Sequence, residues 1–156
     1  MPEGAEPLLL FRTMAVSPRA WTKMAAASLL DKGPLPLRER EIVIHRTAAR
    51  CVCEWGVHAV LFAQRAGLDE DQLLATAAES VDSALWSEAE AVLLETVDAL
   101  ILCKALDDME FARLSRHFSN DQILEIIQLV AFYHGVALIC GALDLAPEPG
   151  TPKLPS

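Results

Sequence analysis

Three side chains suited to acid–base or nucleophilic chemistry, Cys51, Glu54 and His58, lie within eight residues of one another. On a helix, which turns by about 100° per residue, they fall at about 0°, 300° and 340° and share one face. The imidazole of His58 can then take a proton from a thiol or from a substrate carbon, while Glu54 orients and charges it. The spacing therefore predicts a Cys/Glu/His site. A position for Cys51 in the first turn of that helix favours its thiolate.

Each of these residues also has a purely structural interpretation. In an apolar helix, His58 can be a hydrogen-bonded core residue and Cys51 a small core residue. Glu54 pairs with His58 whether or not a reaction takes place, because a buried carboxylate needs a partner. Cys53 points about 200° away from Cys51 on the same helix and lies outside this face.

Helix-start and helix-stop signals divide the rest of the chain into short helices. Ser17-Pro18 places a cap before a proline at the first helical position, and Ser87 with Glu90 has capping-box spacing. Between such signals, apolar residues recur at intervals of three and four. The pattern predicts helices over residues 8–15, 18–31, 37–49, 51–66, 70–82, 88–104, 108–117 and 121–141. No segment has a convincing strand pattern, so the predicted fold class is all-α.

Length and composition predict one domain that is rich in apolar residues. The chain has 156 residues, of which 53% are apolar, and its mean hydropathy is +0.28. We expect a helical domain over residues 1–145 and a proline-rich tail over residues 146–156, which is extended or disordered. The high hydropathy predicts either a membrane segment or apolar surface buried between subunits.

One apolar run tests the membrane alternative. Residues 126–143 contain no Asp, Glu, Lys or Arg, which reaches the length of a membrane-spanning helix. Its flanks, Glu125 and Asp144, are acidic and lack the basic residues typical of a cytoplasmic membrane face. We therefore expect no membrane partner. The run is interpreted as a helix buried on nearly all sides, within one subunit and against a neighbour.

The charge of the chain restricts its partners. The formal net charge is −9, which makes nucleic acid an improbable partner because phosphate binding needs a basic face. Arg38, Arg40, Arg46 and Arg50 form a local basic group that either attracts a small anion or is a solvated helix face. The first ten residues lack a basic secretory region, so we expect a cytoplasmic protein with reduced cysteines.

Three blocks of sequence resemble the carboxymuconolactone decarboxylase superfamily, which includes the alkylhydroperoxidase D-like proteins. They are Leu35 to Glu41, Glu54 to His58 and Gln64 to Leu68, and their order and spacing together are fairly specific. The resemblance extends to Phe118 to Val136. It implies a helical hairpin with the site between its helices, and a homo-oligomer that is a trimer or a hexamer.

The resemblance also implies roles for individual residues. Members with peroxidase activity have a Glu, eleven residues, Cys-x-x-Cys, three residues and a His. These positions correspond here to Glu39, Cys51, Glu54 and His58, so Glu54 occupies the place of the second cysteine. Glu39 and Cys51 are twelve residues apart, about 18 Å on one straight helix. A role for Glu39 therefore requires a chain break before Cys51, which the resemblance implies.

We expect an enzyme that acts without an organic cofactor on a small substrate, which is anionic if the arginines bind it. Its chemistry is either proton transfer at a carbon next to a carbonyl or weak, thiol-dependent peroxide reduction. His58 is the proposed base, with Glu54 as its partner, Cys51 as the thiol and Arg38 or Arg40 as an anion contact. Trp55 and His134 are further candidates for the substrate pocket, although both also fit a core role.

Two further expectations and one alternative function complete the sequence-based interpretation. No metal is expected, because Glu54, His58 and His134 lack a recognised ligand spacing. His45 replaces an apolar residue of the family pattern and is expected to be exposed. The alternative function is a non-catalytic, oligomeric ligand-binding or structural module on the same fold.

Overall fold

The computed structural model describes residues 6–53 and 56–153, and these residues form helices with no strand among them. The all-α prediction is therefore confirmed. The elements in chain order are α1 (Leu9–Met14), α2 (Pro18–Ala27), α3 (Leu37–Arg50), α4 (Gly56–His58), the π-helical turn η1 (Ala59–Ala63), α5 (Glu70–Ala75), α6 (Glu88–Cys103), α7 (Asp108–Leu114) and α8 (Asn120–Ala142).

The predicted helix starts follow from side-chain caps that the structure contains. Ser17 accepts a hydrogen bond from the backbone N–H of Ala20, and Pro18 takes the first helical position of α2. Ser87, Asp107 and Ser119 each form a capping box at the start of α6, α7 and α8. These caps satisfy backbone N–H groups that have no partner inside the helix.

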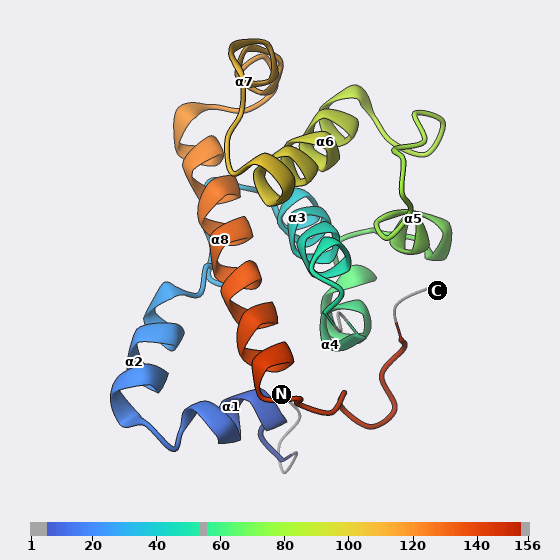
Figure 1. Ribbon diagram of the computed structural model, residues 1–156. Helices are drawn as coiled ribbons and strands as arrows, with labels where there is room; N and C mark the ends of the chain where they lie inside the picture. The colour runs from blue at the N-terminus through green and yellow to red at the C-terminus, as the bar shows by residue number, and fades with distance from the viewer. Residues whose placement is uncertain (1–5, 54–55, 154–156) are drawn as a thin grey trace.

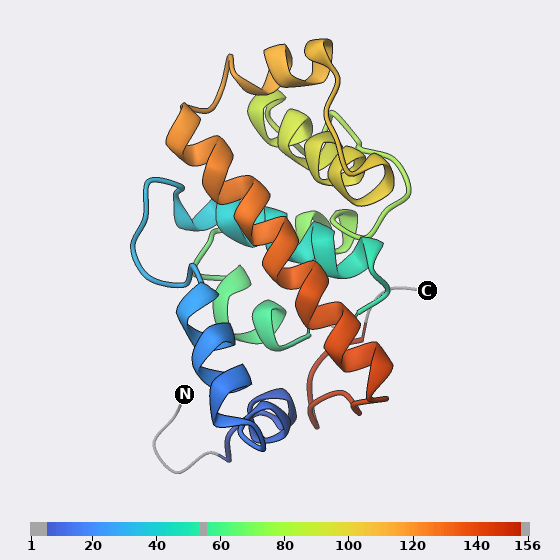
Figure 2. The same ribbon diagram turned by 60° about the vertical axis from the view of Figure 1, so that its left-hand side comes forward.

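The core is built around α3, which packs against both α6 and α8 (Figures 1 and 2). Ile42, Val43 and Ile44 of α3 are all buried. Facing residues such as Leu93 of α6 and Ile126 of α8 are fully buried as well. Helices α1 and α2 pack on each other at the lower end of the molecule in Figure 1. Because α3 lies at the centre, its side chains can meet side chains from several other helices at one site.

The helix expected from residue 51 begins only at Gly56. After α3, the Val52 N–H donates to the Ala49 carbonyl at 3.1 Å and the Cys53 N–H to the Ala48 carbonyl at 2.9 Å. Val52 has a left-handed φ of 52°. This is a Schellman turn, which ends a helix and reverses the chain, and it normally carries glycine. Segment α4–η1 consequently folds back on α3, which gives the expected helical hairpin.

The arginines of α3 bind other parts of the chain. Arg46 is fully buried and makes a bidentate ion pair with Asp98 of α6, at 2.6 and 2.8 Å, and Arg50 binds the same carboxylate. Arg38 binds Glu90 and Gln72, and Arg40 donates to the Leu29 and Asp31 carbonyls. The group is therefore neither a solvated face nor a free anion site. Its guanidinium groups connect α3 to its neighbours.

Helix α8 is only partly buried in the single chain. Ile126, Leu129 and Tyr133 face the core, whereas Leu124 and Leu138 are 68% and 64% exposed. The expected burial of the remaining face against a neighbouring subunit stays a prediction. Helix α8 is also long and apolar enough to cross a membrane, a criterion that core helices meet as well, so the finding is weak evidence.

The chain after α8 has no regular secondary structure as far as it is described, and it contains a turn in which the Thr151 N–H donates to the Glu148 carbonyl. It lies against the body of the protein. The backbone N–H of Leu9, at the start of α1, donates to the carboxylate of Glu148. A Cβ atom on Gly56 would lie 2.4 Å from the Pro152 carbonyl and 2.7 Å from Cβ of Thr151. Glycine at position 56 thus allows the tail to cross the start of α4.

Candidate functional site

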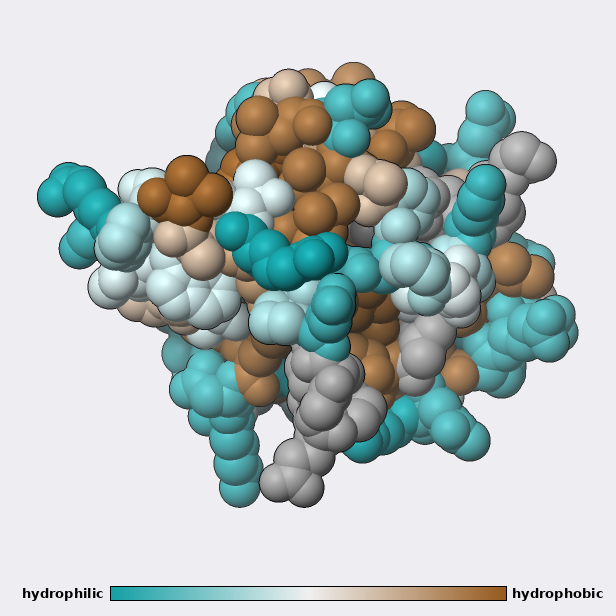
Figure 3. Space-filling view, turned by 90° about the horizontal axis from the view of Figure 1, so that it is seen from below, coloured by the Kyte–Doolittle hydropathy of each residue, from teal (hydrophilic) through white to brown (hydrophobic). Residues whose placement is uncertain are grey.

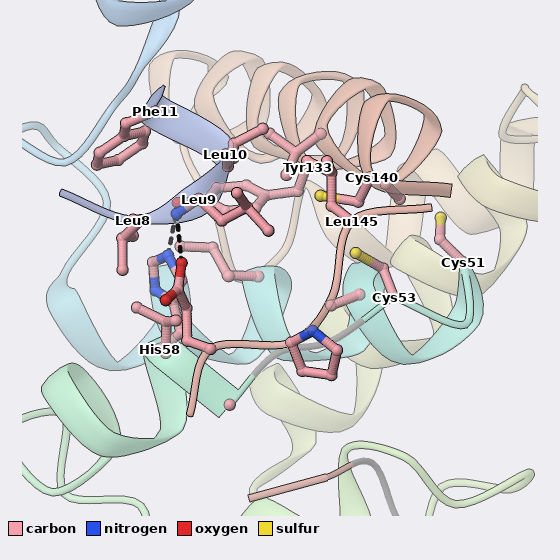
Figure 4. A pocket seen from close by; sticks show the side chains of 18 of the residues that line it. Leu8, Leu9, Leu10, Phe11, Cys51, Cys53, His58, Tyr133, Cys140 and Leu145 are labelled. Carbon is pink, nitrogen blue, oxygen red and sulfur yellow. Dashed lines mark hydrogen bonds between the residues drawn. The ribbon is translucent and has the colours of Figure 1, made fainter. Parts of the chain in front are cut away.

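A cavity of about 480 Å³ lies between the N-terminal helices, the hairpin, α8 and the tail (Figure 4). Most of its wall is apolar, with Leu8, Phe11 and Trp21 from the N-terminal segment and Phe132 and Val136 from α8. The lower face, where α1 and the tail lie, shows a group of hydrophobic side chains in the upper part of the view, with hydrophilic side chains beside and below it (Figure 3). Such an apolar pocket with a few polar groups is typical of a small-molecule site.

His58 lies in the wall of this cavity and has a hydrogen-bond partner on each ring nitrogen. Its Nδ1 is 3.0 Å from Oε2 of Glu41 on α3. Its Nε2 is 3.0 Å from the hydroxyl of Tyr133 on α8, a residue that Figure 4 shows beside it. The N–H group at Nδ1 of His58 donates a hydrogen bond to the carboxylate of Glu41. Burial raises the pKa of Tyr133 above its ordinary value, so the phenol keeps its proton and donates it to Nε2. The arrangement fixes one imidazole tautomer.

Glu41 has no exposed surface, so its charge needs compensation inside the protein. Its Oε2 receives the hydrogen bond from His58. Its Oε1 has no hydrogen bond among the described residues, but Nε of Arg40 lies 3.7 Å away. Arg40, at 12% side-chain exposure, therefore supports the buried carboxylate electrostatically and does not reach into the cavity.

His45 is also buried, which overturns the expectation that it is exposed. Its Nε2 lies 3.9 Å from Oε2 of Glu41, and its ring packs edge-on against His58 with 6.4 Å between ring centres. Burial, followed by the repulsion from His58, lowers the pKa of His45 to about 3. His45 is therefore neutral at physiological pH and leaves Glu41 to pair with Arg40 and His58.

The acidic partner of His58 in the described residues is Glu41, whereas the sequence analysis named Glu54 as its partner and the family resemblance placed a further glutamate at Glu39. Residues two apart on a helix point about 200° from each other, so Glu39 and Glu41 cannot serve the same site. Glu39 remains on α3 with its Oε2 buried and without a hydrogen-bond partner in the described part of the chain. The fold-back at Val52 brings His58 opposite position 41 of α3.

Cys51 and His58 do not lie on one helix, because residues 51–53 form a turn after α3 and His58 ends α4. Cys51 and His58 both line the cavity, but no hydrogen bond joins them. Burial raises the pKa of Cys51, with nearby Lys104 acting in the opposite direction. Glu54 and Trp55 lie outside the described residues.

The remaining predicted contacts lie away from the cavity. Arg38 is engaged with Glu90, Gln72 and the Gly67 carbonyl, and neither Arg38 nor Arg40 lines the cavity. His134 does not line it either, since it follows Tyr133 by one residue and therefore points about 100° away around α8.

Two residues of the site, Glu41 and Tyr133, were missed from the sequence. Each carried a signal. Glu41 begins the buried run Ile42-Val43-Ile44, where a carboxylate needs a partner. Tyr133 continues the buried stripe of α8, which runs through Ile126, Leu129, Val130 and Ala137. Periodicity therefore favours Tyr133 over its neighbour His134.

The opposite end of the cavity carries sulfur. Cys51, Cys53 and Cys140 line it, whereas Cys103 is exposed on α6. Among the described residues, no group of three or more His, Cys, Asp or Glu side chains is arranged to hold a metal ion. The cavity thus combines acid–base groups and thiols in one apolar space.

Sequence comparison relates the chain to one family. Residues 16–98 match the carboxymuconolactone decarboxylase family. The uncharacterized protein YnjA of Escherichia coli strain K12 is 31% identical over 127 residues, which cover 80% of this chain and 68% of YnjA.

Two solved structures share the fold. An uncharacterized peroxidase-related protein from Silicibacter sp. TM1040 superposes with a TM-score of 0.76 at 15% identity, covering 90% of this chain and 76% of that one. A protein of unknown function from Agrobacterium tumefaciens, whose name relates it to the antioxidant defence protein AhpD, gives a TM-score of 0.76 at 22% identity. That match covers 87% of this chain and 95% of the Agrobacterium protein. Both likenesses concern the helical architecture.

Proposed function

Because the chain belongs to the carboxymuconolactone decarboxylase family and has the AhpD-like helical fold, we propose that it is an enzyme that moves a proton to or from a largely apolar substrate. The observation that supports this function is the hydrogen-bonded series Glu41–His58–Tyr133 in the wall of an apolar cavity. Acid–base groups held at fixed distances in a site of low polarity are the usual requirement for this chemistry.

In the proposed reaction, the hydroxyl of Tyr133 is the group next to the substrate. A substrate carbon beside a carbonyl gives its proton to the Tyr133 oxygen as the phenolic proton passes to Nε2 of His58. The resulting imidazolium is stabilised by the carboxylate of Glu41, 3.0 Å from Nδ1. The reverse sequence protonates the carbanion or enolate, so the same groups serve both directions.

The lining of the cavity favours an uncharged substrate. Its described residues include no Lys or Arg, and they do include the acidic side chains Asp144 and Glu148. An anionic substrate would lose its hydration without gaining a cationic partner. We therefore propose a neutral, mostly hydrocarbon carbonyl compound in place of the small anion that the arginines suggested.

A non-catalytic module is the less favoured alternative. A module that only supports an assembly has no need for an open space at its buried histidine, whereas about 480 Å³ remains open here. Cys51 has no catalytic role in this proposal, because burial raises its pKa and no hydrogen bond joins it to His58.

Exchange of a carbon-bound proton tests the proposal. The probe is 2-tetralone, an uncharged bicyclic ketone, whose α-deuterium uptake in D₂O is followed by proton NMR. We expect the wild-type protein to accelerate exchange over buffer, and His58→Gln and Tyr133→Phe to reduce that acceleration by about 10²- to 10⁴-fold. His134→Gln is the matched control on α8 and retains the wild-type rate. No acceleration by wild type, or equal rates for wild type and His58→Gln, contradicts the proposal.

We also propose that the chain forms a homo-oligomer through α8. The exposed Leu124 and Leu138 on this apolar helix support an interface with another copy. Light scattering coupled to size exclusion should give a mass above that of one chain, and Leu138→Glu should lower it. A monomeric wild-type protein contradicts this part of the proposal.

A further inference from the structure

The thiols at one end of the cavity include a contact between residues far apart in the sequence. Cys53 follows the turn after α3, and Cys140 lies near the C-terminal end of α8. Figure 4 shows both sulfur atoms directed toward the cavity, and the Cys53 thiol is hydrogen-bonded to Cys140. Both residues are half-buried and are thiols in the structure.

The three thiols differ in reactivity. The hydrogen bond from Cys53 lowers the pKa of Cys140 from 9.0 to about 7, so a substantial part of Cys140 is thiolate at neutral pH. Burial acts in the opposite direction on Cys51 and raises its pKa. The charged neighbour of Cys51 is Lys104, at the end of α6, instead of a second thiol. Cys140 is thus a better nucleophile than Cys51.

Backbone hydrogen bonds hold both cysteines at helix ends. The Cys53 N–H donates to the Ala48 carbonyl in the turn that closes α3. The Cys140 carbonyl accepts the N–H of Leu145, at 3.0 Å, in the turn that closes α8. Both turns contain a left-handed residue that is not glycine, Val52 with φ 52° and Asp144 with φ 48°. Two Schellman turns therefore present the thiols to each other.

The thiol pair is separate from the acid–base groups. Tyr133 and Cys140 are seven residues apart on α8, which is two turns, so they lie on the same face about 10 Å apart. Both line the same cavity. A molecule in the cavity can therefore meet either group, but the imidazole of His58 does not serve Cys140 directly.

We propose that Cys53 and Cys140 form a dithiol–disulfide redox pair that closes across one end of the cavity. The oxidant is a low-molecular-weight disulfide. The Cys140 thiolate attacks one of its sulfur atoms, so that a mixed disulfide forms and one small thiolate leaves. Cys53 then loses its proton to solvent and attacks the Cys140 sulfur, which releases the second small thiolate. The two protein thiols lose two electrons, the small disulfide gains them, and a dithiol reverses the exchange.

Closure of this bond has a structural consequence. It covalently joins the turn of the hairpin to the end of α8, two segments that border the cavity. The position of the second cysteine also differs from the Cys-x-x-Cys pattern, in which both thiols come from one hairpin segment. The pairing of Cys53 with Cys140 is therefore inferred from their contact in the folded protein and not from a sequence pattern.

The test uses the full chain, reduced and then equilibrated with mixtures of reduced and oxidised glutathione. Remaining thiols are alkylated with N-ethylmaleimide under denaturing conditions and counted by intact mass. Variants are required because Arg50 and Arg65 place Cys51 and Cys53 on one tryptic peptide. We expect wild type, Cys51→Ser and Cys103→Ser to lose two alkylatable thiols without added glutathione mass. Cys53→Ser and Cys140→Ser should lose no pair of alkylatable thiols without a gain of glutathione mass.

A second measurement separates the redox pair from a loss of folding. The pH dependence of Cys140 alkylation by iodoacetamide, measured on native protein, should have its midpoint near 7 in wild type and move toward 9.0 in Cys53→Ala. His58→Gln should keep the disulfide, so failure of the proposed acid–base function does not affect this result. A disulfide that still closes in Cys53→Ser, or no disulfide in wild type at any glutathione ratio, overturns the proposal.

Discussion

The two ends of the cavity are built in different ways. At one end, Glu41 and Tyr133 lie inside the long helices α3 and α8 and hold His58 from both sides at 3.0 Å. At the other end, Cys53 and Cys140 lie at turns that close those same helices. Residues within regular, packed helices have little freedom, which suits proton transfer between fixed partners. Residues at helix ends can move by the small amount that bond formation between two sulfur atoms requires.

The comparison predicts that the two ends can be altered independently. The largest effect should follow from changes at the acid–base end. Glu41→Gln keeps the shape of the side chain but removes the charge that stabilises the His58 imidazolium. We expect proton exchange of 2-tetralone to fall by about 100-fold or more, while disulfide formation with glutathione stays unchanged. Equal exchange rates in wild type and Glu41→Gln would show that the charge of Glu41 does not assist proton transfer.

The acid–base end should also lose stability in acid. The unfolded chain protonates His45 below its ordinary pKa of 6.5, but the folded protein does so only near 3. The unfolded state therefore binds more protons as the pH falls, and the free energy of unfolding decreases by about 2 kcal/mol between pH 7 and pH 5. Urea denaturation measures this change.

The matched variants for that measurement are His45→Leu and His117→Gln. His45→Leu removes the buried imidazole and should flatten the profile over this range, whereas His117→Gln should keep the wild-type slope. A wild-type slope in His45→Leu would show that His58, Glu41 or another group causes the acid sensitivity.

A smaller effect should come from the thiol end. Val52 is 87% exposed and has a left-handed φ, a conformation that costs an L-residue about 1–2 kcal/mol. Glycine adopts it without this cost but loses more entropy on folding. We expect Val52→Gly to raise the free energy of unfolding by about 1 kcal/mol. Asp144→Gly in the matching turn should gain less, because Asp tolerates this region better than Val. Urea denaturation of both variants checks the order.

The smallest effect is expected for Cys51→Ser. The Cys51 thiol has a raised pKa and belongs neither to the Glu41–His58–Tyr133 series nor to the Cys53–Cys140 pair. Both the rate of proton exchange of 2-tetralone and the number of thiols oxidised by glutathione should therefore stay near wild type. A large loss of either activity in this variant would return Cys51 to the site that the sequence first indicated.

Local signals explain which parts of the fold could be predicted from the sequence. The capping box at Ser87 involves residues three apart, so it marked the start of α6 correctly. The turn after α3 was missed because Val52 occupies the position that glycine normally marks. The resemblance to the family supplied the hairpin, but local periodicity alone extended a helix through residues 51–53.

The site was harder to predict because its contacts are tertiary. His58 was identified from its position in the family pattern, whereas its partners depend on where the hairpin and α8 place other side chains. Glu41 is 17 residues from His58 and Tyr133 is 75 residues away. The family pattern implied Glu39 as the acidic residue on α3, but the contact made by His58 is with Glu41. The contact between Cys53 and Cys140 had no sequence signal at all.

The tautomer of His58 provides the most direct test of the central claim, that Glu41 and Tyr133 hold this imidazole as a proton-transfer group. Long-range proton–nitrogen NMR on histidine-labelled protein distinguishes a protonated from an unprotonated ring nitrogen. With neutral imidazole, the account predicts a proton on Nδ1, shared with Glu41, and an unprotonated Nε2 that accepts from Tyr133. A proton on Nε2 and none on Nδ1 would contradict the account.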